Sequence, residues 1–245
     1  MKFTQIAVLC ALASTAAFTQ AAVWQDFSLS ALYGENYKAP FAAGNEKIDQ
    51  STITAEYAAG LKYGDIFAFA DRTNNDLSGN ETYFEVAPRL SLGAVTGQKL
   101  ELGPIKDVLI ATTWEGNSGA SDFNNYLYGI GFALDIPYTS YANINFYKAD
   151  NDLQKDDYQM TITYAVPFKI GGEEFLADAF LDWSTAEGPD HKSELNWTSQ
   201  YKWNVGKHIS PETKLYLGIE HSVWNNKFGT DVDQHDVSAL VKYHF

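Results

Sequence analysis

Apolar and polar residues alternate with a period of two over most of the chain. In the segment that begins at Asn125, the side chains of Tyr126, Tyr128 and Ile130 share one parity, whereas Asn125 and Gly129 share the other. Successive side chains of a strand point to opposite faces, so this alternation predicts strands with one apolar face and one polar face.

The same pattern continues along the chain and predicts about twelve strands. Most of these segments have about 9–11 residues, which is what a tilted strand needs to cross a bilayer. An even number of strands is typical of a bacterial single-chain outer-membrane barrel. The predicted strands lie near residues 26–34, 51–63, 66–73, 82–92, 106–115, 125–136, 141–148, 158–168, 175–184, 194–205, 213–224 and 236–245.

The connections differ in length on the two sides of the predicted sheet. Connections after odd-numbered strands are mostly long, polar and acidic, such as residues 35–50 and 185–193. Those after even-numbered strands are mostly short, such as Gly64-Asp65, although residues 93–105 form a long exception. This asymmetry is typical of an outer-membrane barrel, and a soluble sandwich has no reason to show it.

The first 22 residues resemble a secretory signal peptide. Lys2 supplies the positive charge, an apolar core runs from Ile6 to Phe18, and small residues follow, with cleavage after Ala21 or Ala22. We therefore expect a mature chain of residues 23–245. Lipid attachment at Cys10 is a poor alternative because the apolar core has barely begun there.

The composition limits the chemistry of the mature chain. Cys10 is the only cysteine among 245 residues, so the mature chain has no disulfide and no thiolate site. The formal net charge is −14, and the loss of Lys2 makes it −15. Nucleic-acid binding is disfavoured because phosphate contacts depend on Lys and Arg.

The apolar face has the residues expected against lipid. Phe, Leu, Ile, Val and Ala occupy strand centres, and the chain ends on Phe245, after a strand that alternates cleanly. We therefore predict an all-β protein, a closed antiparallel transmembrane β-barrel in the bacterial outer membrane, with a secreted soluble β-sandwich as the alternative. We also expect the barrel-assembly machinery to recognise Phe245. The aromatic residues expected at the two membrane interfaces are Trp24, Tyr57, Tyr63, Trp114, Tyr126, Tyr128, Tyr164, Trp183, Trp197, Tyr201, Trp203 and Tyr243.

The opposite parity of each strand should line the lumen, where both signs of charge are mixed with aromatic rings. Ion pairing within the wall is the simplest role for any one of these charges. A mixed lining also suits a neutral, polar, flat solute, because rings stack on a base and carboxylates accept hydrogen bonds from hydroxyls. The candidate solute-binding residues are Asp178, Phe180, Asp182, Tyr147, Arg89, Glu56, Glu85, Lys202, Tyr216 and Glu220. Other predicted lumen residues are Lys62, Arg72, Asp107, Asp135, Asn143, Asn145, Gln159, Glu194, Lys242 and His244.

Asp178, Phe180 and Asp182 form the most suggestive group. They fall at alternate positions of one predicted strand, so two carboxylates flank a ring on one face. A sugar-and-base contact is one interpretation, and pairing of the carboxylates with Arg89 or Lys202 is the other.

No arrangement for catalysis or for binding a metal or cofactor stands out. His221 and Ser222 are neighbours in a predicted strand and therefore point to opposite faces, so they cannot form a base–nucleophile pair. No histidine pair has the spacing of metal ligands. We expect neither an enzyme nor a cofactor.

Several segments resemble the Tsx/OmpK family of nucleoside-specific channel-forming outer-membrane proteins. The resemblance rests on the order and spacing of the segments, and it covers most of the mature chain. The segments are Leu32-Tyr33-Gly34-Glu35-Asn36-Tyr37, Lys62-Tyr63-Gly64-Asp65-Ile66-Phe67, Pro88-Arg89-Leu90-Ser91-Leu92, Pro104-Ile105-Lys106-Asp107-Val108-Leu109, Asn125-Tyr126-Leu127-Tyr128-Gly129-Ile130-Gly131 and Trp224-Asn225-Asn226-Lys227-Phe228-Gly229.

This resemblance implies a monomeric twelve-stranded barrel with a narrow pore, which takes up nucleosides passively. We therefore expect an outer-membrane channel for small polar solutes, with nucleosides as the substrate class. Two alternatives are a non-conducting receptor barrel that acts through its acidic outer loops, and a lipid-active barrel enzyme that uses His221.

Overall fold

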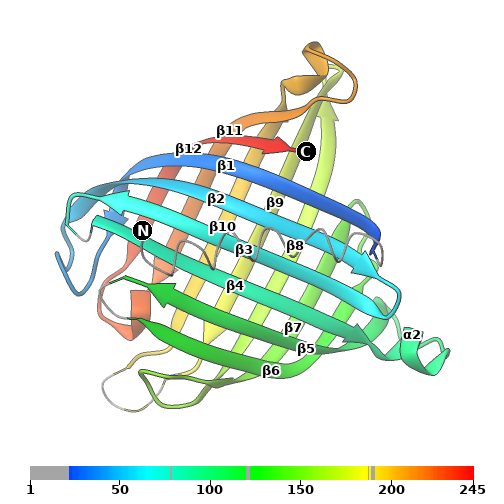
Figure 1. Ribbon diagram of the computed structural model, residues 1–245, viewed down its shortest axis with the longest axis horizontal. Helices are drawn as coiled ribbons and strands as arrows, with labels where there is room; N and C mark the ends of the chain where they lie inside the picture. Colours follow the sequence, from blue (N-terminus) through cyan, green and yellow to red (C-terminus); the bar gives the residue numbers. More distant parts are fainter. Residues whose placement is uncertain (1–21, 78, 120–121, 187, 189–190) are drawn as a thin grey trace, which may run out of the picture.

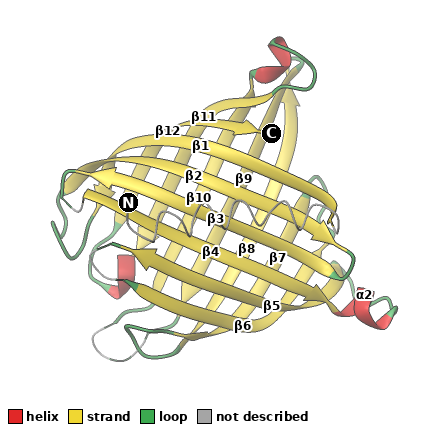
Figure 2. Ribbon diagram, viewed as in Figure 1, coloured by secondary structure: helices red, strands yellow, loops and turns green. Residues whose placement is uncertain are grey.

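The protein is a closed barrel of twelve antiparallel strands (Figures 1 and 2). The computed structural model describes residues 22–77, 79–119, 122–186, 188 and 191–245, so the signal-peptide prediction lies almost wholly outside the described residues. The strands are β1 (Ala22–Lys38), β2 (Lys47–Leu61), β3 (Gly64–Asn75), β4 (Gly79–Ser91), β5 (Ile105–Ser118), β6 (Phe123–Leu134), β7 (Tyr141–Asp150), β8 (Asp157–Ile170), β9 (Glu173–Ser184), β10 (Glu194–Asn204), β11 (Lys214–Asn225) and β12 (Gln234–His244).

Every strand pairs with its neighbours in sequence, and β1 closes the barrel against β12. In this closing pair, Ser28 lies opposite His244 and Tyr33 lies opposite Ala239. The predicted strand number is confirmed, and each predicted boundary lies within four residues of the observed one.

Short helical segments occur only in connections of the described chain: α2 (Leu92–Thr96), η1 (Gly206–His208) and η2 (Lys227–Gly229). Helix α2 occupies the long connection between β4 and β5. Ser91 Oγ caps its N-terminus by accepting a hydrogen bond of 2.9 Å from the backbone amide of Ala94. Within the described residues, none of the helices has the length and apolar character required to traverse a bilayer.

The two ends of the barrel differ less in connection length than predicted. The fully described connections at the loop end are residues 39–46, 151–156 and 226–233. The turn end holds the start of β1, the end of β12 and two long connections, residues 92–104 with α2 and residues 205–213 with η1. Tight connections such as residues 171–172 lie at the turn end.

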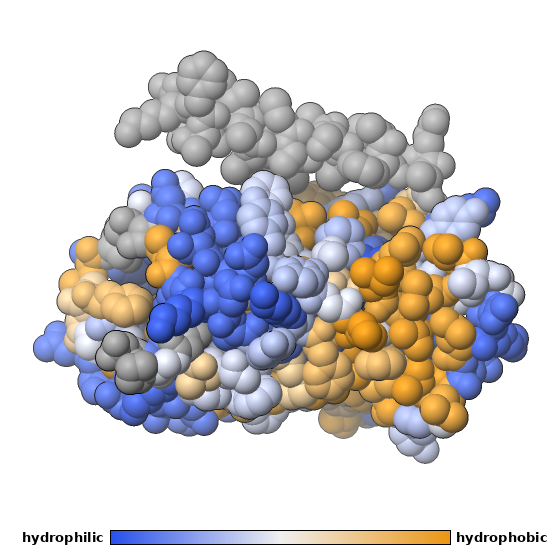
Figure 3. Space-filling view, turned by 90° about the horizontal axis from the view of Figure 1, so that it is seen from below, coloured by the Kyte–Doolittle hydropathy of each residue, from blue (hydrophilic) through white to orange (hydrophobic). Residues whose placement is uncertain are grey.

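Alternate side chains of each strand lie in two different environments. In β12, Gln234, Asp236 and Ser238 are buried, whereas Val237 and Val241 are about half exposed on the outside. A space-filling view shows apolar side chains gathered over a broad area of the outer surface, with hydrophilic residues beside it (Figure 3). Polar side chains inside and exposed apolar side chains outside are expected when the interior of a barrel holds water and its exterior contacts lipid.

A bulge in β1 changes the direction in which its loop-end residues point. The register between β1 and β2 shifts between Gly34 and Tyr37, which turns the ring of Tyr37 inward. The Tyr37 hydroxyl lies 2.9 Å from Ser238 Oγ on β12. This contact links β1 and β12 at the loop end, beyond the last backbone pair of their ladder.

The structure corrects four side-chain predictions. Arg72 pairs with Ile53 on the outer face and donates to Thr82 Oγ1 at 2.8 Å, because it lies near the loop end where a charged tip reaches water. Lys62 and Asp135 lie in connections at the turn end rather than on the lumen wall. Trp24 pairs with Gly60 and shares the inward parity of β1, so it does not belong to the outer aromatic belt.

Candidate solute-binding lumen

The strand register places all ten candidate binding residues on the lumen wall. Paired residues of adjacent strands share a face, and the pairs connect Asp178 with Gln200, Gln200 with Glu220, and Glu220 with Ser238. The same argument places Glu85 opposite Phe69, whose other partner is Glu56. The predicted parity of these residues is therefore confirmed, while their contact with a solute stays a prediction.

Three ion pairs line the part of the lumen from mid-barrel to the turn end, and we call them the central ion pairs. Arg89 binds Asp65 through two hydrogen bonds of 2.7 and 2.8 Å. Lys202 Nζ lies 2.7 Å from Asp178 Oδ1, and Lys242 pairs with Glu56.

These cations are deeply buried in the wall. The side chain of Lys202 is 1% exposed, that of Lys242 is 5% exposed and that of Arg89 is 14% exposed. Lys202 also lies within electrostatic range of Lys242 and Glu56, so two of the pairs belong to one network. The central ion pairs thus present hydrogen-bonding atoms with little net charge.

The two carboxylates in the group of Asp178, Phe180 and Asp182 have different partners. Asp178 is paired with Lys202, as the ion-pair interpretation required. Asp182 accepts a hydrogen bond of 2.5 Å from Thr161 Oγ1, and no described cation pairs with it. Phe180 lies between them on the same face.

A second set of carboxylates lines the lumen toward the loop end, and we call it the acidic vestibule. Glu85 lies within electrostatic range of Glu115, Asp182 and Asp71. The hydrogen bonds to these carboxylates come from neutral donors, in contrast to the central ion pairs. They join Asp71 to Thr54 (2.6 Å), Glu85 to Tyr83 (2.6 Å), Glu115 to Asn125 (3.4 Å), Asp182 to Thr161 (2.5 Å) and Glu220 to Gln200 (2.8 Å).

Aromatic rings run beside the acidic vestibule and form a ladder across the wall. The centroids of Phe67 and Phe69 are 6.0 Å apart, those of Phe69 and Tyr83 are 5.8 Å apart, and those of Tyr83 and Phe123 are 6.3 Å apart. This aromatic ladder was not among the predicted lumen residues. The parity that Phe67 and Phe69 share with Asp65 and Asp71 is the signal that would have found it.

The two tyrosines among the candidates have different surroundings. Tyr147 is only 5% exposed and packs with Ala111, Leu127 and Ala149, so it is part of the packed wall. Tyr216 lines a groove of about 450 Å³ at the turn end. Of the two, Tyr216 is therefore the ring that is available to a solute.

Residues 224–229 form a compact cluster at the loop end. Lys227 in η2 donates to Gln234 Oε1 at 2.7 Å and to the Lys38 carbonyl oxygen at 2.9 Å. Its ammonium lies 4.9 Å from the ring centroid of Trp224 and 5.2 Å from that of Phe228. Burial lowers the pKa of Lys227 to about 8, because these neutral partners replace water only in part.

The surroundings of His221 do not suit catalysis. His221 lies on the outer face, where its ring is 6.3 Å from that of Trp197, whereas Ser222 is buried on the lumen side. In the described chain, no group of three or more His, Cys, Asp or Glu residues is arranged to hold a metal ion.

Comparison with known proteins identifies the family. The family described as "Nucleoside-specific channel-forming protein, Tsx" matches residues 22–245. The chain belongs to this family. The Tsx-family assignment agrees with the resemblance found in the sequence, and the relatives of the chain include outer membrane proteins.

Individual relatives of this Tsx-family chain are distant. Outer membrane protein OmpK of Vibrio parahaemolyticus is 28% identical over 180 residues, which are 69% of this chain and 66% of that protein. Nucleoside-specific channel-forming protein Tsx of Salmonella typhimurium is 26% identical over 231 residues, which are 80% of this chain and 79% of that protein. The chain thus spans slightly less than two thirds of the length of OmpK.

Solved structures similar to the Tsx-family chain include the KdgM porin and the translocator domain of the autotransporter NalP from Neisseria meningitidis. The first has a TM-score of 0.49 and 10% identity, and the match covers 89% of this chain and 99% of that chain. The second has a TM-score of 0.48 and 10% identity, with 99% and 95% covered.

Removal of one cation tests the role of the central ion pairs. We expect Lys202→Met to lower the free energy of unfolding by on the order of 2 to 3 kcal/mol, because it leaves the Asp178 carboxylate without its cation. Urea unfolding followed by tryptophan fluorescence measures this loss. The double variant Lys202→Met/Asp178→Asn should recover much of it, and a single variant as stable as the parent would contradict the assignment.

The pH dependence of stability tests the environment of Lys227. Its folded-state pKa of about 8 lies below the value of about 10.4 for an unfolded chain, so unfolding takes up a proton between these pH values. Below pH 8 the folded protein carries the full free-energy cost of burying the ammonium. This cost falls as the pH rises and the buried amine loses its proton. The unfolding free energy of the parent should therefore rise relative to Lys227→Met by on the order of 2 kcal/mol across this window. A constant difference between the two proteins from pH 7 to pH 10.5 would contradict it.

Proposed function

We propose that the protein is a passive channel for nucleosides across the outer membrane. Its membership of a family described as nucleoside-specific and channel-forming supports this proposal. The observation that carries it is the side-by-side arrangement of the aromatic ladder and the acidic vestibule on one wall. Phe69 lies directly opposite both Glu56 and Glu85 in the sheet register.

A nucleoside matches both parts of this wall. Its base is planar and stacks on Phe69 or Phe67, a contact that is worth about 1–3 kcal/mol per base where it has been measured. Its ribose hydroxyls donate hydrogen bonds, which carboxylates such as Glu85 and Asp182 accept. Several weak contacts of this kind recruit a solute and still release it.

The charge distribution favours neutral solutes over anions. The acidic vestibule lies toward the loop end, and its hydrogen-bond partners are neutral, so it repels phosphorylated nucleotides from the aromatic ladder beside it. The central ion pairs then offer polar atoms without a strong net field. We infer that charge excludes nucleotides and that stacking selects nucleosides.

We further propose that the barrel acts as a monomer and that the assembly machinery recognises its C-terminal strand. Phe245 is 69% exposed on the outside, and its backbone amide donates to the Phe27 carbonyl oxygen at 2.9 Å. This exposed aromatic terminus is the support for recognition. The closed strand order leaves no free sheet edge that would require a second copy.

Conductance of single channels in planar bilayers tests the proposed function. We expect uridine to reduce the ion current of the parent, whereas uridine monophosphate and a neutral sugar of similar size have little effect. In Phe69→Leu the uridine concentration for half-block should rise about fivefold or more, because stacking is lost.

The matched control is Phe132→Leu, which removes a ring from the outer face. Its block by uridine should equal that of the parent. Unchanged block in Phe69→Leu would exclude the aromatic ladder from the solute path. A folded barrel with no conductance would favour the receptor alternative.

A further inference from the structure

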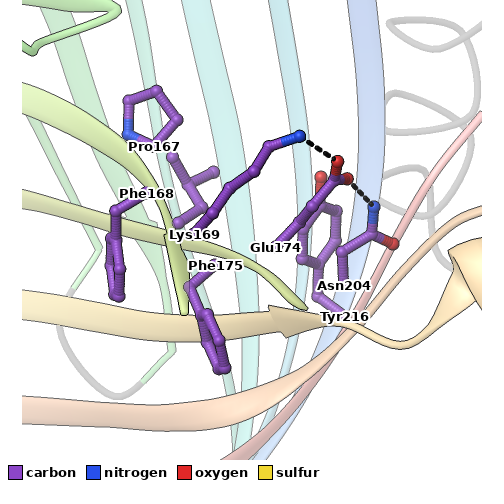
Figure 4. A pocket seen from close by; sticks show the side chains of 8 residues that line it. Pro167, Phe168, Lys169, Glu174, Phe175, Asn204 and Tyr216 are labelled. Atoms are coloured by element: carbon purple, nitrogen blue, oxygen red, sulfur yellow. Dashed lines mark hydrogen bonds and ion pairs between the residues drawn. The ribbon is translucent and has the colours of Figure 1, made fainter. Parts of the chain in front are cut away.

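A groove at the turn end of the lumen has the composition of a second solute site. It has a volume of about 450 Å³, within the range of roughly 300–1,000 Å³ for small-molecule sites. Strands β8 to β11 build it, and Pro167 and Tyr216 supply apolar surface (Figure 4). The groove is separate from the aromatic ladder, which lies on β3, β4 and β6.

The polar side chains of this groove are held in a fixed arrangement. Glu174 pairs with Lys169 at 3.0 Å and accepts a hydrogen bond of 3.2 Å from Asn204 Nδ2. Figure 4 shows these three side chains linked in a row beside Tyr216. Because the Asn204 amide nitrogen is committed to Glu174, its carbonyl oxygen is the free end of the amide.

That oxygen has no partner. The described residues contain five buried side-chain nitrogen or oxygen atoms without a hydrogen-bond partner, and two of them flank Tyr216. One is Asn204 Oδ1, and Asn204 lies directly opposite Tyr216 in the pairing of β10 with β11. The other is His244 Nε2, whose ring lies 5.5 Å from the Tyr216 ring. An acceptor left unsatisfied in a buried site costs free energy that a suitable donor would recover.

Tyr216 is braced on the side away from the groove. The His244 ring meets it edge to face at 68°, and His244 Nδ1 lies 2.6 Å from Asp26 Oδ2. A second side chain therefore fixes the tyrosine, and a stacking ring fixed beforehand loses little conformational entropy when a planar ligand binds.

We propose that this groove is a turn-end subsite that prefers nucleosides whose base carries an exocyclic amino group. The proposal rests on the nucleoside channel proposed above and adds a preference among bases. The base stacks on Tyr216, and its amino group donates to Asn204 Oδ1 after a small rotation of the amide. Glu174 accepts a second hydrogen bond from the ligand, since its carboxylate is 43% exposed.

Adenosine and inosine provide the sharpest pair of probes, because they differ in having an amino group or an oxo group at the same ring position. An oxo oxygen facing Asn204 Oδ1 would place two acceptors together. One net hydrogen bond corresponds to roughly a three- to tenfold difference in affinity. Adenosine added on the turn-end side should therefore block current at about a three- to tenfold lower concentration than inosine.

The test is that measurement repeated with two leucine substitutions on β10. Asn204→Leu removes the free acceptor, so adenosine and inosine should block at equal concentrations. Asn196→Leu makes the same change on the same lumen face near the loop end, and it should retain the preference. The shift in gel mobility on heating verifies that each variant forms a folded barrel.

The outcomes separate the subsite from the channel. Equal block by adenosine and inosine in the parent, or a preference that survives Asn204→Leu, overturns the subsite and leaves the nucleoside channel intact. Absence of block by any nucleoside overturns both. Should Asn204→Leu fail to fold, Tyr216→Leu replaces it, and retention of the preference there likewise overturns the subsite.

Discussion

Closure of the sheet between β1 and β12 is the constraint on which the rest of the structure depends. A strand edge exposed to hydrocarbon leaves backbone amides and carbonyls unpaired, at a cost of several kcal/mol for each group. The pair from Ser28–His244 to Tyr33–Ala239 removes that edge. Once the ring is closed, every strand has one face toward lipid and one toward the lumen, so the polar side chains of all twelve strands must find their partners inside, among themselves or in water.

The lumen meets this requirement in two ways, and each way predominates toward a different end of the barrel. From mid-barrel to the turn end, buried cations such as Lys202 neutralise carboxylates. Toward the loop end, carboxylates such as Glu85 are held by neutral donors such as Tyr83. In the proposed channel, a solute entering from the loop end would meet negative potential and aromatic rings first and the self-neutralised wall second.

The sequence was sufficient for the fold because a period of two and the length of a strand are local properties. Parity alone placed Asp178, Phe180 and Glu220 on the lumen wall, and the structure agrees. It could not show that Asp178 is paired whereas Asp182 is not, because partners come from strands that are distant in sequence. It also failed for Arg72, which lies on the outer face near the loop end, where the charged tip donates to Thr82 instead of facing the lumen.

Oxygen and nickel accessibility of spin labels along β10 in bilayers tests most directly whether the two parities face lipid and water. Residues 23–245 contain no cysteine, so labels can be attached to single cysteines introduced one at a time from Leu195 to Trp203. The barrel arrangement predicts that oxygen accessibility peaks at the odd-numbered positions from Leu195 to Trp203, and that accessibility to a water-soluble nickel complex peaks at the even-numbered positions from Asn196 to Lys202. Equal accessibility along the strand, or the opposite phase, would contradict it.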